Sequence, residues 1–400
     1  MFKLLSQFNI IAIMIRLVKF FLFLFLGLYS SFSIAQKEAN IWYFGRNAGV
    51  DFNSGSPIPL IDGELNTFEG CATISDSNGN LVLYTDGKTV WDKNHDIMPR
   101  GRGLLGDSSS TQSGIIIPKP NDSNVYYIFT VDEEAGPNGL RYSEIDISLN
   151  AGNGDITLNK NILLKTPSTE KISAIQHANG NDYWVVAHEW QTNNFLSYRI
   201  TSTGVNINPI ITSIGSVHGS IGSVIGYMKI SPNGKRIALA KWSNNSIVEL
   251  FDFDNSTGII SNPITIDGMF YQGAQAGAYG LEFSPNSNVL YVTDTYSNLS
   301  GQNKVHQYNI NLVNKDDIIN SNVILYENGD SVTAMQLAVD GKIYLANYKT
   351  SFLDVIENPN SIGTGATYVN RGLNLNGKIS SAGLPPFIQS LFVIEIEAEN

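Results

Sequence analysis

Three polar residues that could take part in chemistry recur just before short apolar segments of this chain. Glu69, Gln112 and Lys171 are separated by 43 and 59 residues. Carboxyl, amide and amine groups that converge can bind a sugar or a peptide, and aromatic neighbours add apolar contact. If the fold gathers these positions, the sequence predicts a binding site for a polar ligand.

The full predicted site is a ring of polar and aromatic residues, each preceding or beginning an apolar segment. Such residues would meet where several strands start around one axis. No catalytic residue and no metal ligand is assigned. The predicted ligand-contacting residues are Glu69, Gln112, Ser113, Lys171, Tyr227, Tyr279, Thr333 and Phe387.

Enzyme motifs are missing from the sequence. The five histidines show no HExxH or other close zinc spacing, and there is no GxSxG nucleophile motif. We therefore predict a non-enzymatic binding module without a cofactor. The alternatives are a carbohydrate-active or lactonase-like hydrolase with its site at the same mouth, and a structural adhesin domain.

Two acidic runs could bind calcium through their oxygen atoms. Asp252, Asp254 and Asn255 form one run, and residues 132–134 form the other. The first run lacks the ligand spacing of an EF-hand loop. We interpret the first as a hairpin turn and the second as a solvated loop, with a structural calcium ion as the alternative.

The elements that would position the site come from a repeat of strand, turn and strand. Its turns are rich in Asn, Asp, Gly and Pro, and four of them align on Gly180, Gly234, Ser287 and Gly341, at spacings of 54, 53 and 54 residues. The six copies are CATISDSNGNLVLYTD from Cys71, IIIPKPNDSNVYYIFTVD from Ile115, AIQHANGNDYWVVAH from Ala174, YMKISPNGKRIALAKW from Tyr227, LEFSPNSNVLYVTD from Leu281 and MQLAVDGKIYLAN from Met335.

A period near 50 residues with about four strands per unit is typical of a β-propeller blade. The 365 residues that follow residue 35 hold about seven such periods. The sequence therefore predicts an all-β, seven-bladed propeller of four-stranded antiparallel blades over residues 36–400. The seventh blade is expected to pair residues 41–53 with residues 387–396, which would close the ring and remove open sheet edges.

The first 35 residues have the pattern of an export signal. Arg16 and Lys19 precede the apolar core FFLFLFLGLY, and small residues precede the expected cleavage before Gln36. Translation could start at Met1 or Met14, and an uncleaved membrane anchor is the alternative. After cleavage we expect no membrane span.

Charge and cysteine content narrow the class of protein further. A net charge of -11 argues against a nucleic-acid partner, because nucleic-acid binders usually carry a basic face. Cys71 is the single cysteine, so no disulfide can form within the chain and stability must come from a large core.

Four segments have features beyond those of a generic propeller. They are NIWYFGRNAGVDFNSGSP (Asn40 to Pro57), FEGCATISDSNGNLVLYTDGKTVW (Phe68 to Trp91), LLGDSSSTQSGIIIPKP (Leu104 to Pro120) and GLPPFIQS (Gly383 to Ser390). These segments resemble the amino-terminal propeller of large secreted proteins of Bacteroidota, within the WD40-like and YVTN-like propellers. That resemblance implies export to the extracellular space or the outer cell surface, with the periplasm as the alternative. It also implies an extracellular glycan, peptide or envelope protein as partner.

Members of that family typically carry a gliding-motility-associated sorting domain for type IX secretion at the carboxy terminus. This sequence ends at Asn400 without such a domain. Surface attachment through that pathway would require a downstream segment. SPNGKRIALAKW and SPNSNVLYVTD also resemble the hairpin unit of TolB-like and lactonase-like propellers, a unit that many unrelated functions share.

Overall fold

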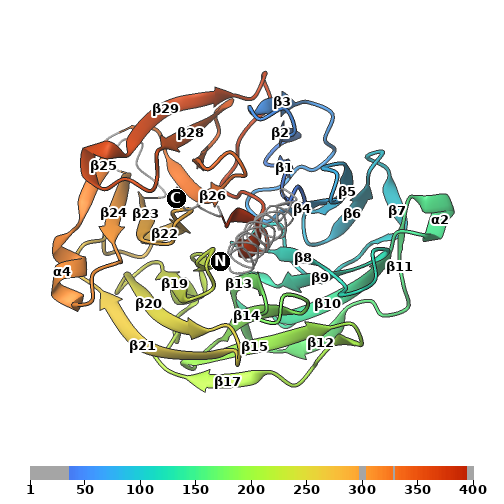
Figure 1. Ribbon diagram of the computed structural model, residues 1–400, viewed down its shortest axis with the longest axis horizontal. Coiled ribbons are helices and arrows are strands. Elements are labelled where there is room, and N and C mark those ends of the chain that lie inside the picture. The colour runs from blue at the N-terminus through green and yellow to red at the C-terminus, as the bar shows by residue number, and fades with distance from the viewer. Residues whose placement is uncertain (1–35, 297–302, 328, 394–400) are drawn as a thin grey trace, which may run out of the picture. The chain divides into compact units, whose positions relative to one another are not determined.

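The computed structural model describes residues 36–296, 303–327 and 329–393, and most regular elements in them are β-strands. The chain divides into two units, Met1–Gln36 and Lys37–Asn400, and all of the sheets lie in the second. Seven antiparallel sheets are arranged around a common centre (Figure 1). The second unit is therefore an all-β, seven-bladed propeller, which confirms the predicted fold class.

The first four blades, in chain order, contain three to five strands each. Blade 1 contains β1 (Ile41–Phe44), β2 (Ala48–Asp51) and β3 (Ile58–Leu60). Blade 2 contains β4 (Ala72–Ser75), β5 (Leu81–Thr85), β6 (Thr89–Asp92) and β7 (Ile97–Arg102). Blade 3 contains β8 (Gly114–Pro118), β9 (Val125–Val131), β10 (Leu140–Asp146), β11 (Asp155–Ile156) and β12 (Ile162–Lys165). Blade 4 contains β13 (Ser168–Gln176), β14 (Tyr183–Glu189), β15 (Asn194–Thr201), β16 (Gly204–Val205) and β17 (Ile210–Ser213).

The last three blades have four strands each. Blade 5 contains β18 (Met228–Ile230), β19 (Arg236–Lys241), β20 (Ile247–Asp254) and β21 (Ile259–Ile266). Blade 6 contains β22 (Ala276–Phe283), β23 (Val289–Tyr296), β24 (Lys304–Asn309) and β25 (Val323–Glu327). Blade 7 contains β26 (Val332–Leu337), β27 (Ile343–Asn347), β28 (Phe352–Glu357) and β29 (Thr367–Asn374).

Short helical turns join some of these strands. In blades 3 and 4 the fourth strand position is shared by two short strands, because β11 and β12 both pair with β10, and β16 and β17 both pair with β15. The helical turns are η1 (Glu133–Ala135), α2 (Leu149–Gly152), α3 (Ile221–Val224), α4 (Lys315–Asn320), η2 (Gly363–Gly365) and η3 (Gln389–Phe392).

The repeat has a conformational basis at its aligned turn position. Gly180, Gly234, Ser287 and Gly341 all have positive φ, with values of 73°, 68°, 61° and 77°. Left-handed backbone is strained for residues with a Cβ atom, so glycine is favoured there. Ser287 tolerates the strain, and its hydroxyl accepts a hydrogen bond from the backbone N–H of Asn233 in blade 5. The regular spacing therefore reflects the hairpin between the first two strands of each blade.

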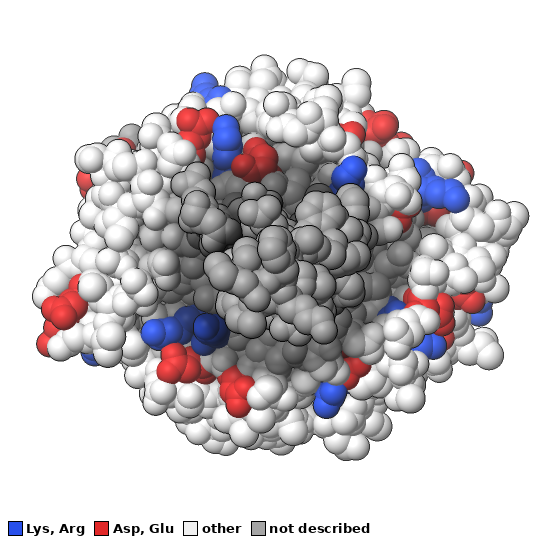
Figure 2. Space-filling view, viewed as in Figure 1, with Lys and Arg blue, Asp and Glu red and all other residues white. Residues whose placement is uncertain are grey.

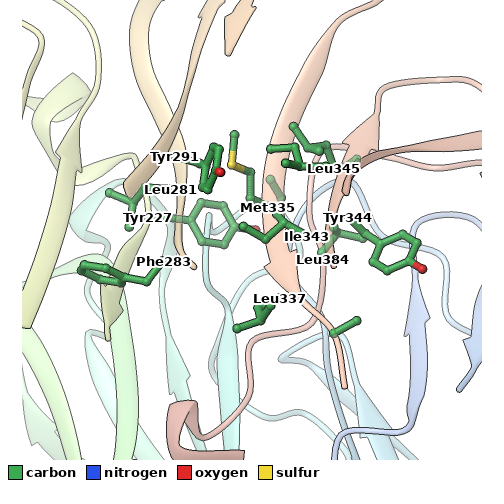
Figure 3. Packing of buried hydrophobic residues seen from close by; sticks show 14 of the residues in the cluster. Tyr227, Leu281, Phe283, Tyr291, Met335, Leu337, Ile343, Tyr344, Leu345 and Leu384 are labelled. Atoms are coloured by element: carbon green, nitrogen blue, oxygen red, sulfur yellow. The ribbon is translucent and has the colours of Figure 1, made fainter. Parts of the chain in front are cut away.

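The core lies between neighbouring blades. Figure 3 shows Tyr227 next to Met335 of β26, and Leu281 and Phe283 of β22 belong to the same buried cluster. In these strands alternate side chains face the adjoining blade, as the two-residue period of a strand requires. A large apolar core, without a disulfide, joins the blades into one domain.

The structure does not show the closing blade that the sequence predicts. Pairing of residues 41–53 with residues 387–396 is not confirmed, because Gln389–Phe392 form η3 and residues 394–396 lie outside the described part. Pro385 and Pro386 have no N–H to donate to a strand ladder. The two ends meet instead through an isolated bridge between Arg46 and Ile379.

The segment that follows this bridge crosses the channel. Phe387 packs against Trp42 of blade 1, with ring centroids 5.9 Å apart. The next residue, Ile388, forms a parallel bridge with Ala174 on β13 of blade 4. Figure 1 shows η3 near the centre of the ring, in deep red. The described part of the carboxy-terminal segment predicted to close a blade, residues 387–393, therefore lies near the middle of the propeller.

Other predictions concern the surface and the amino-terminal segment. On the face in Figure 2, acidic and basic side chains are interspersed around the periphery. Among the residues that the structure describes, no helix has both the length and the apolar character to cross a membrane. The predicted export signal, residues 1–35, lies outside the described residues.

Candidate functional site

A cavity of about 530 Å³ lies at one mouth of the channel, among loops and strand ends from several blades. This volume falls within the range of small-molecule sites. The wall holds five aromatic and four acidic residues, and Gln275, two isoleucines and small residues complete it. The aromatic residues are Phe68, Trp242, Tyr279, Tyr296 and Tyr348, and the acidic residues are Glu69, Glu133, Glu134 and Glu170.

A second pocket, of about 400 Å³, lies along β7 at the edge of blade 2. Two of its three cationic side chains are already engaged. Arg100 forms an ion pair with Asp155 at 2.9 Å, and Lys160 donates hydrogen bonds to the carbonyl oxygens of Arg100 and Arg102. The channel-mouth cavity, whose wall draws on most blades, is the stronger candidate.

Irregularities in three inner strands bring side chains into the cavity. The pairing register shifts between Ser168 and Ile172 on β13, between Ala278 and Leu281 on β22, and between Val332 and Met335 on β26. A β-bulge redirects the side chains beside it. Glu170, Tyr279 and Thr333 lie within these shifts and line the cavity.

Glu69 and Tyr279 form the polar centre of the wall. The Tyr279 hydroxyl donates a hydrogen bond of 3.0 Å to Oε1 of Glu69. Burial raises the pKa of Glu69 well above its usual range, and the nearby Glu170 raises it further, while the Tyr279 bond opposes the shift. Burial likewise raises the pKa of Tyr279. The pair therefore presents a neutral phenol and a readily protonated carboxyl to the cavity.

Glu170 anchors the loop that carries two other glutamates of the wall. Its carboxylate accepts hydrogen bonds from the backbone N–H and hydroxyl of Thr111, at 2.8 and 2.5 Å. It also accepts one from the backbone N–H of Glu134 in η1, at 2.8 Å. Burial raises the pKa of Glu170, and these donors oppose the increase. Much of its hydrogen-bonding capacity thus holds the mouth together.

Lys171 was predicted to contact ligand, but it lies outside the cavity wall. Its ammonium group donates to the carbonyl oxygens of Ser223, Val224 and Ile225, at 3.1, 2.9 and 2.7 Å. The side chain is fully buried, and this burial lowers its pKa. Lys171 therefore supports the α3 segment, whose Ile221 lines the cavity.

Gln112 and Ser113 also lie outside the wall. The Gln112 amide oxygen accepts from the backbone N–H groups of Met228 and Ile172 at 2.8 and 3.3 Å, and its nitrogen donates to the Met228 carbonyl at 3.2 Å. The Ser113 hydroxyl donates to the Asp86 carbonyl oxygen at 3.3 Å. Both side chains are occupied in joining inner strands or neighbouring loops.

Two predicted aromatic contacts are part of the core. Tyr227 lies behind Tyr279, with ring centroids 5.6 Å apart in an edge-to-face arrangement. Phe387 is 2% exposed and packs on Trp42. Glu69, Tyr279 and Thr333 are therefore the predicted residues that the structure brings together at the cavity, and ligand binding by them stays a prediction.

Four aromatic residues of the wall, Phe68 among them, were not predicted, although a sequence signal exists for the other three. Trp242, Tyr296 and Tyr348 end or directly follow the second strand of blades 5, 6 and 7, at spacings of 54 and 52 residues. This spacing matches the propeller repeat. An aromatic residue recurring at the end of the second strand would have located this part of the mouth.

The histidines and acidic runs have other contacts. His177 accepts a hydrogen bond from the N–H of Asn179, whereas the His188 ring lies beside the His218 ring, tilted against it, with centroids 4.1 Å apart. Among the described residues, no group of three His, Cys, Asp or Glu could hold a metal ion. Asp254 accepts bonds from the N–H and hydroxyl of Ser256, which confirms the predicted hairpin turn.

Comparisons with known proteins show the fold. No family model matches the chain, and no curated protein matches it. A proposed 6-phosphogluconolactonase from Bacteroides fragilis is 11% identical, with a TM-score of 0.51 over 88% of this chain and 98% of that one. The periplasmic gluconolactonase of Pseudomonas aeruginosa is also 11% identical, with a TM-score of 0.51 over 86% of this chain and 98% of the other.

These likenesses are too distant to transfer an activity, because one fold carries many functions. The resemblance to secreted Bacteroidota propellers and to type IX secretion receives no support from the comparisons. Together with the ring of sheets, the solved structures place this chain among the β-propellers.

Proposed function

We propose that this chain is a non-enzymatic binding module that takes a small polar ligand in its channel-mouth cavity. The observation that carries the proposal is the cavity itself, with a volume of about 530 Å³ and a wall of aromatic rings and carboxyl groups. Sites of this size with a few polar groups among apolar ones are typical of small-ligand recognition. A free glycan or peptide end, or one displayed by an envelope protein outside the cell, is the proposed partner.

The hydrogen-bonding pattern supports binding. Glu170 is held by Thr111 and Glu134, and Trp242 donates through Nε1 to the Thr295 hydroxyl at 3.2 Å. Side chains fixed by the fold lose little conformational freedom when a ligand arrives. The wall therefore forms a preorganised surface.

Thermal unfolding and calorimetry of the full chain with sugars, short peptides and amines test this proposal. We expect at least one class to raise the melting temperature, and Trp242→Ala to remove the shift. Tyr142→Phe, on the outer part of blade 3, is the matched control that should leave binding intact. The proposal fails if no class binds, or if a bound ligand is insensitive to Trp242→Ala, Tyr279→Phe and Tyr348→Ala together.

A lactonase-like or glycoside hydrolase is the second candidate, favoured by one observation. Glu69 faces the cavity with a raised pKa, the property expected of a general acid near neutral pH. Turnover of lactones or glycosides that Glu69→Gln abolishes would support this candidate. Such turnover should decline as pH rises through the pKa of Glu69, because the acid form is lost.

A further inference from the structure

We propose that the ligand of the channel-mouth cavity is a small organic cation, an amine or quaternary ammonium group held by Glu69 and by the rings of Tyr279 and Trp242. This inference rests on the proposed binding function and names the chemical class of the ligand. It follows from the charge of the wall, the rings beside the carboxyl groups, and the lack of a counter-charge for Glu69.

The charge of the wall has one sign. Four glutamates line the cavity, and the described lining residues include no Lys, Arg or His. Lys171 follows the wall residue Glu170 in sequence, but its buried ammonium group donates to three backbone carbonyls behind the wall. A phosphorylated or carboxylated ligand would meet like charge in a partly enclosed space, whereas a cation would meet opposite charge.

The aromatic residues favour the same ligand class. The faces of Trp and Tyr rings attract ammonium groups, and recognition of quaternary ammonium ligands commonly uses such rings. Tyr279 is 5% exposed and is held by Glu69 and by the Tyr227 ring, so its position is fixed. Exposed Lys349 lies 4.8 Å from the centroid of the Tyr348 ring, which shows an ammonium group on one ring of the wall.

Glu69 lacks a cationic partner. Glu170 is attracted by Lys171, but the charges near Glu69 are those of Glu170 and Glu133, and its hydrogen-bond partner is the neutral Tyr279. Burial and these like charges raise the pKa of Glu69. A bound cation would favour the carboxylate, so a protonated Glu69 would release its proton to solvent on binding.

Because cation binding is coupled to proton release from Glu69, the affinity for the cation should depend on pH. The titratable groups of the wall are the carboxyls of Glu69, Glu133, Glu134 and Glu170 and the phenols of Tyr279, Tyr296 and Tyr348. The cationic groups beside it are Lys171, behind the wall, and the exposed Lys349, on the Tyr348 ring. Affinity for a cation should rise as pH increases through the pKa of Glu69 in the free protein. Once Glu69 is ionised, affinity should level off and proton release should cease.

Calorimetry with choline and its neutral isostere, 3,3-dimethylbutan-1-ol, tests the charge requirement. A second pair, butylamine and butan-1-ol, tests a primary amine. With the full chain we expect at least one cation to bind about tenfold or more tightly than its isostere, as an opposite charge near a carboxylate implies. Titrations in two buffers of different ionisation enthalpy should reveal proton release below the pKa of Glu69.

Matched variants identify the residues responsible. Glu69→Gln can still accept the Tyr279 hydrogen bond, and it should remove both the charge preference and the proton release. Glu64→Gln, at an exposed carboxyl outside the wall, should change neither. If Glu69→Gln unfolds, Trp242→Leu serves instead. This variant should weaken binding of the cation more than binding of its neutral isostere.

The outcomes separate the two proposals. In one outcome, neutral or anionic ligands bind as tightly as the cations while still requiring Tyr279 and Trp242. That result overturns the cation inference and leaves the proposed binding function standing. Cation binding that is unchanged by Glu69→Gln and Trp242→Leu also overturns the inference. If no ligand of any charge binds, the proposed function fails and the inference fails with it.

Discussion

The ammonium group of Lys171 on β13 donates a hydrogen bond of 2.7 Å to the carbonyl oxygen of Ile225, in the connection between α3 and β18. The same group reaches the carbonyls of Ser223 and Val224, so one side chain of blade 4 supports the segment that leads into blade 5. Ile221 and Ile225 in this segment line the cavity. The shape of the mouth thus depends on a buried charge outside it.

Replacing Lys171 with methionine should destabilise the protein. The change leaves two buried carbonyl oxygens and a partly buried one without this donor, while it removes the cost of burying an ammonium group. We expect the free energy of unfolding to fall by about 2–4 kcal/mol in urea titrations. For Lys235→Met, a change at an exposed lysine, the free energy of unfolding should fall by much less. Equal stability of the two variants would contradict a supporting role for Lys171.

Acid should destabilise the protein partly through His188. Burial, and then the charge of Lys171, lowers the pKa of His188 to about 3 from an ordinary value of 6.5. Its ring nitrogens have no well-formed hydrogen bond among the described residues, and its ring packs 4.8 Å from that of Phe195. Between these two pKa values the unfolded chain binds a proton that the folded protein does not, so stability falls as pH decreases.

His188→Leu removes this contribution while keeping an apolar contact with Phe195. Between pH 7 and pH 5 we expect the variant to lose about 2 kcal/mol less stability than the original protein. At pH 7 its stability should be equal or higher, because an unpaired buried polar ring has been replaced. Urea unfolding of both proteins at the two pH values checks this, and parallel losses would show that His188 does not titrate on unfolding.

The strands and turns could be predicted because their determinants are local. Alternating apolar residues mark the strands, and the positive φ at Gly180, Gly234 and Gly341 explains a glycine at each repeat. Seven blades followed from the period. The carboxy-terminal segment was harder, since nothing local shows that GLPPFIQS enters the channel and pairs through Ile388 with β13.

The site could be predicted only in part because side-chain direction depends on register. Lys171 was expected at the mouth, but its neighbour Glu170 lines the cavity instead. Adjacent strand residues face opposite sides, and a bulge between Ser168 and Ile172 changes which of them faces the channel. That bulge depends on pairing with β14. Gln112 similarly looked free, yet its amide binds the backbone of blades 4 and 5.

Alanine substitutions at two aligned turn glycines should distinguish the cost of backbone strain from the cost of a steric clash with the new Cβ atom. A Cβ at Gly180 would meet no atom within 4 Å, so Gly180→Ala should cost only the strain of positive φ, about 1 kcal/mol. At Gly234 a Cβ would lie 2.8 Å from Nδ2 of Asn255, which donates to the Gln176 carbonyl. Urea unfolding should therefore show a larger loss for Gly234→Ala. The reverse order would exclude this explanation.

Alanine substitutions at two phenylalanines should distinguish a ring needed for stability from a ring needed for ligand binding. Phe387→Ala removes a ring that packs on Trp42 and Phe392, so we expect a loss of about 3–5 kcal/mol. Phe68 is 48% exposed on the cavity wall, where its ring meets that of Tyr348 edge to face. Phe68→Ala should therefore change stability little and weaken ligand binding. Urea unfolding and calorimetry on both variants measure the two effects. A Phe387→Ala protein of unchanged stability would show that the carboxy-terminal segment does not hold the centre of the propeller.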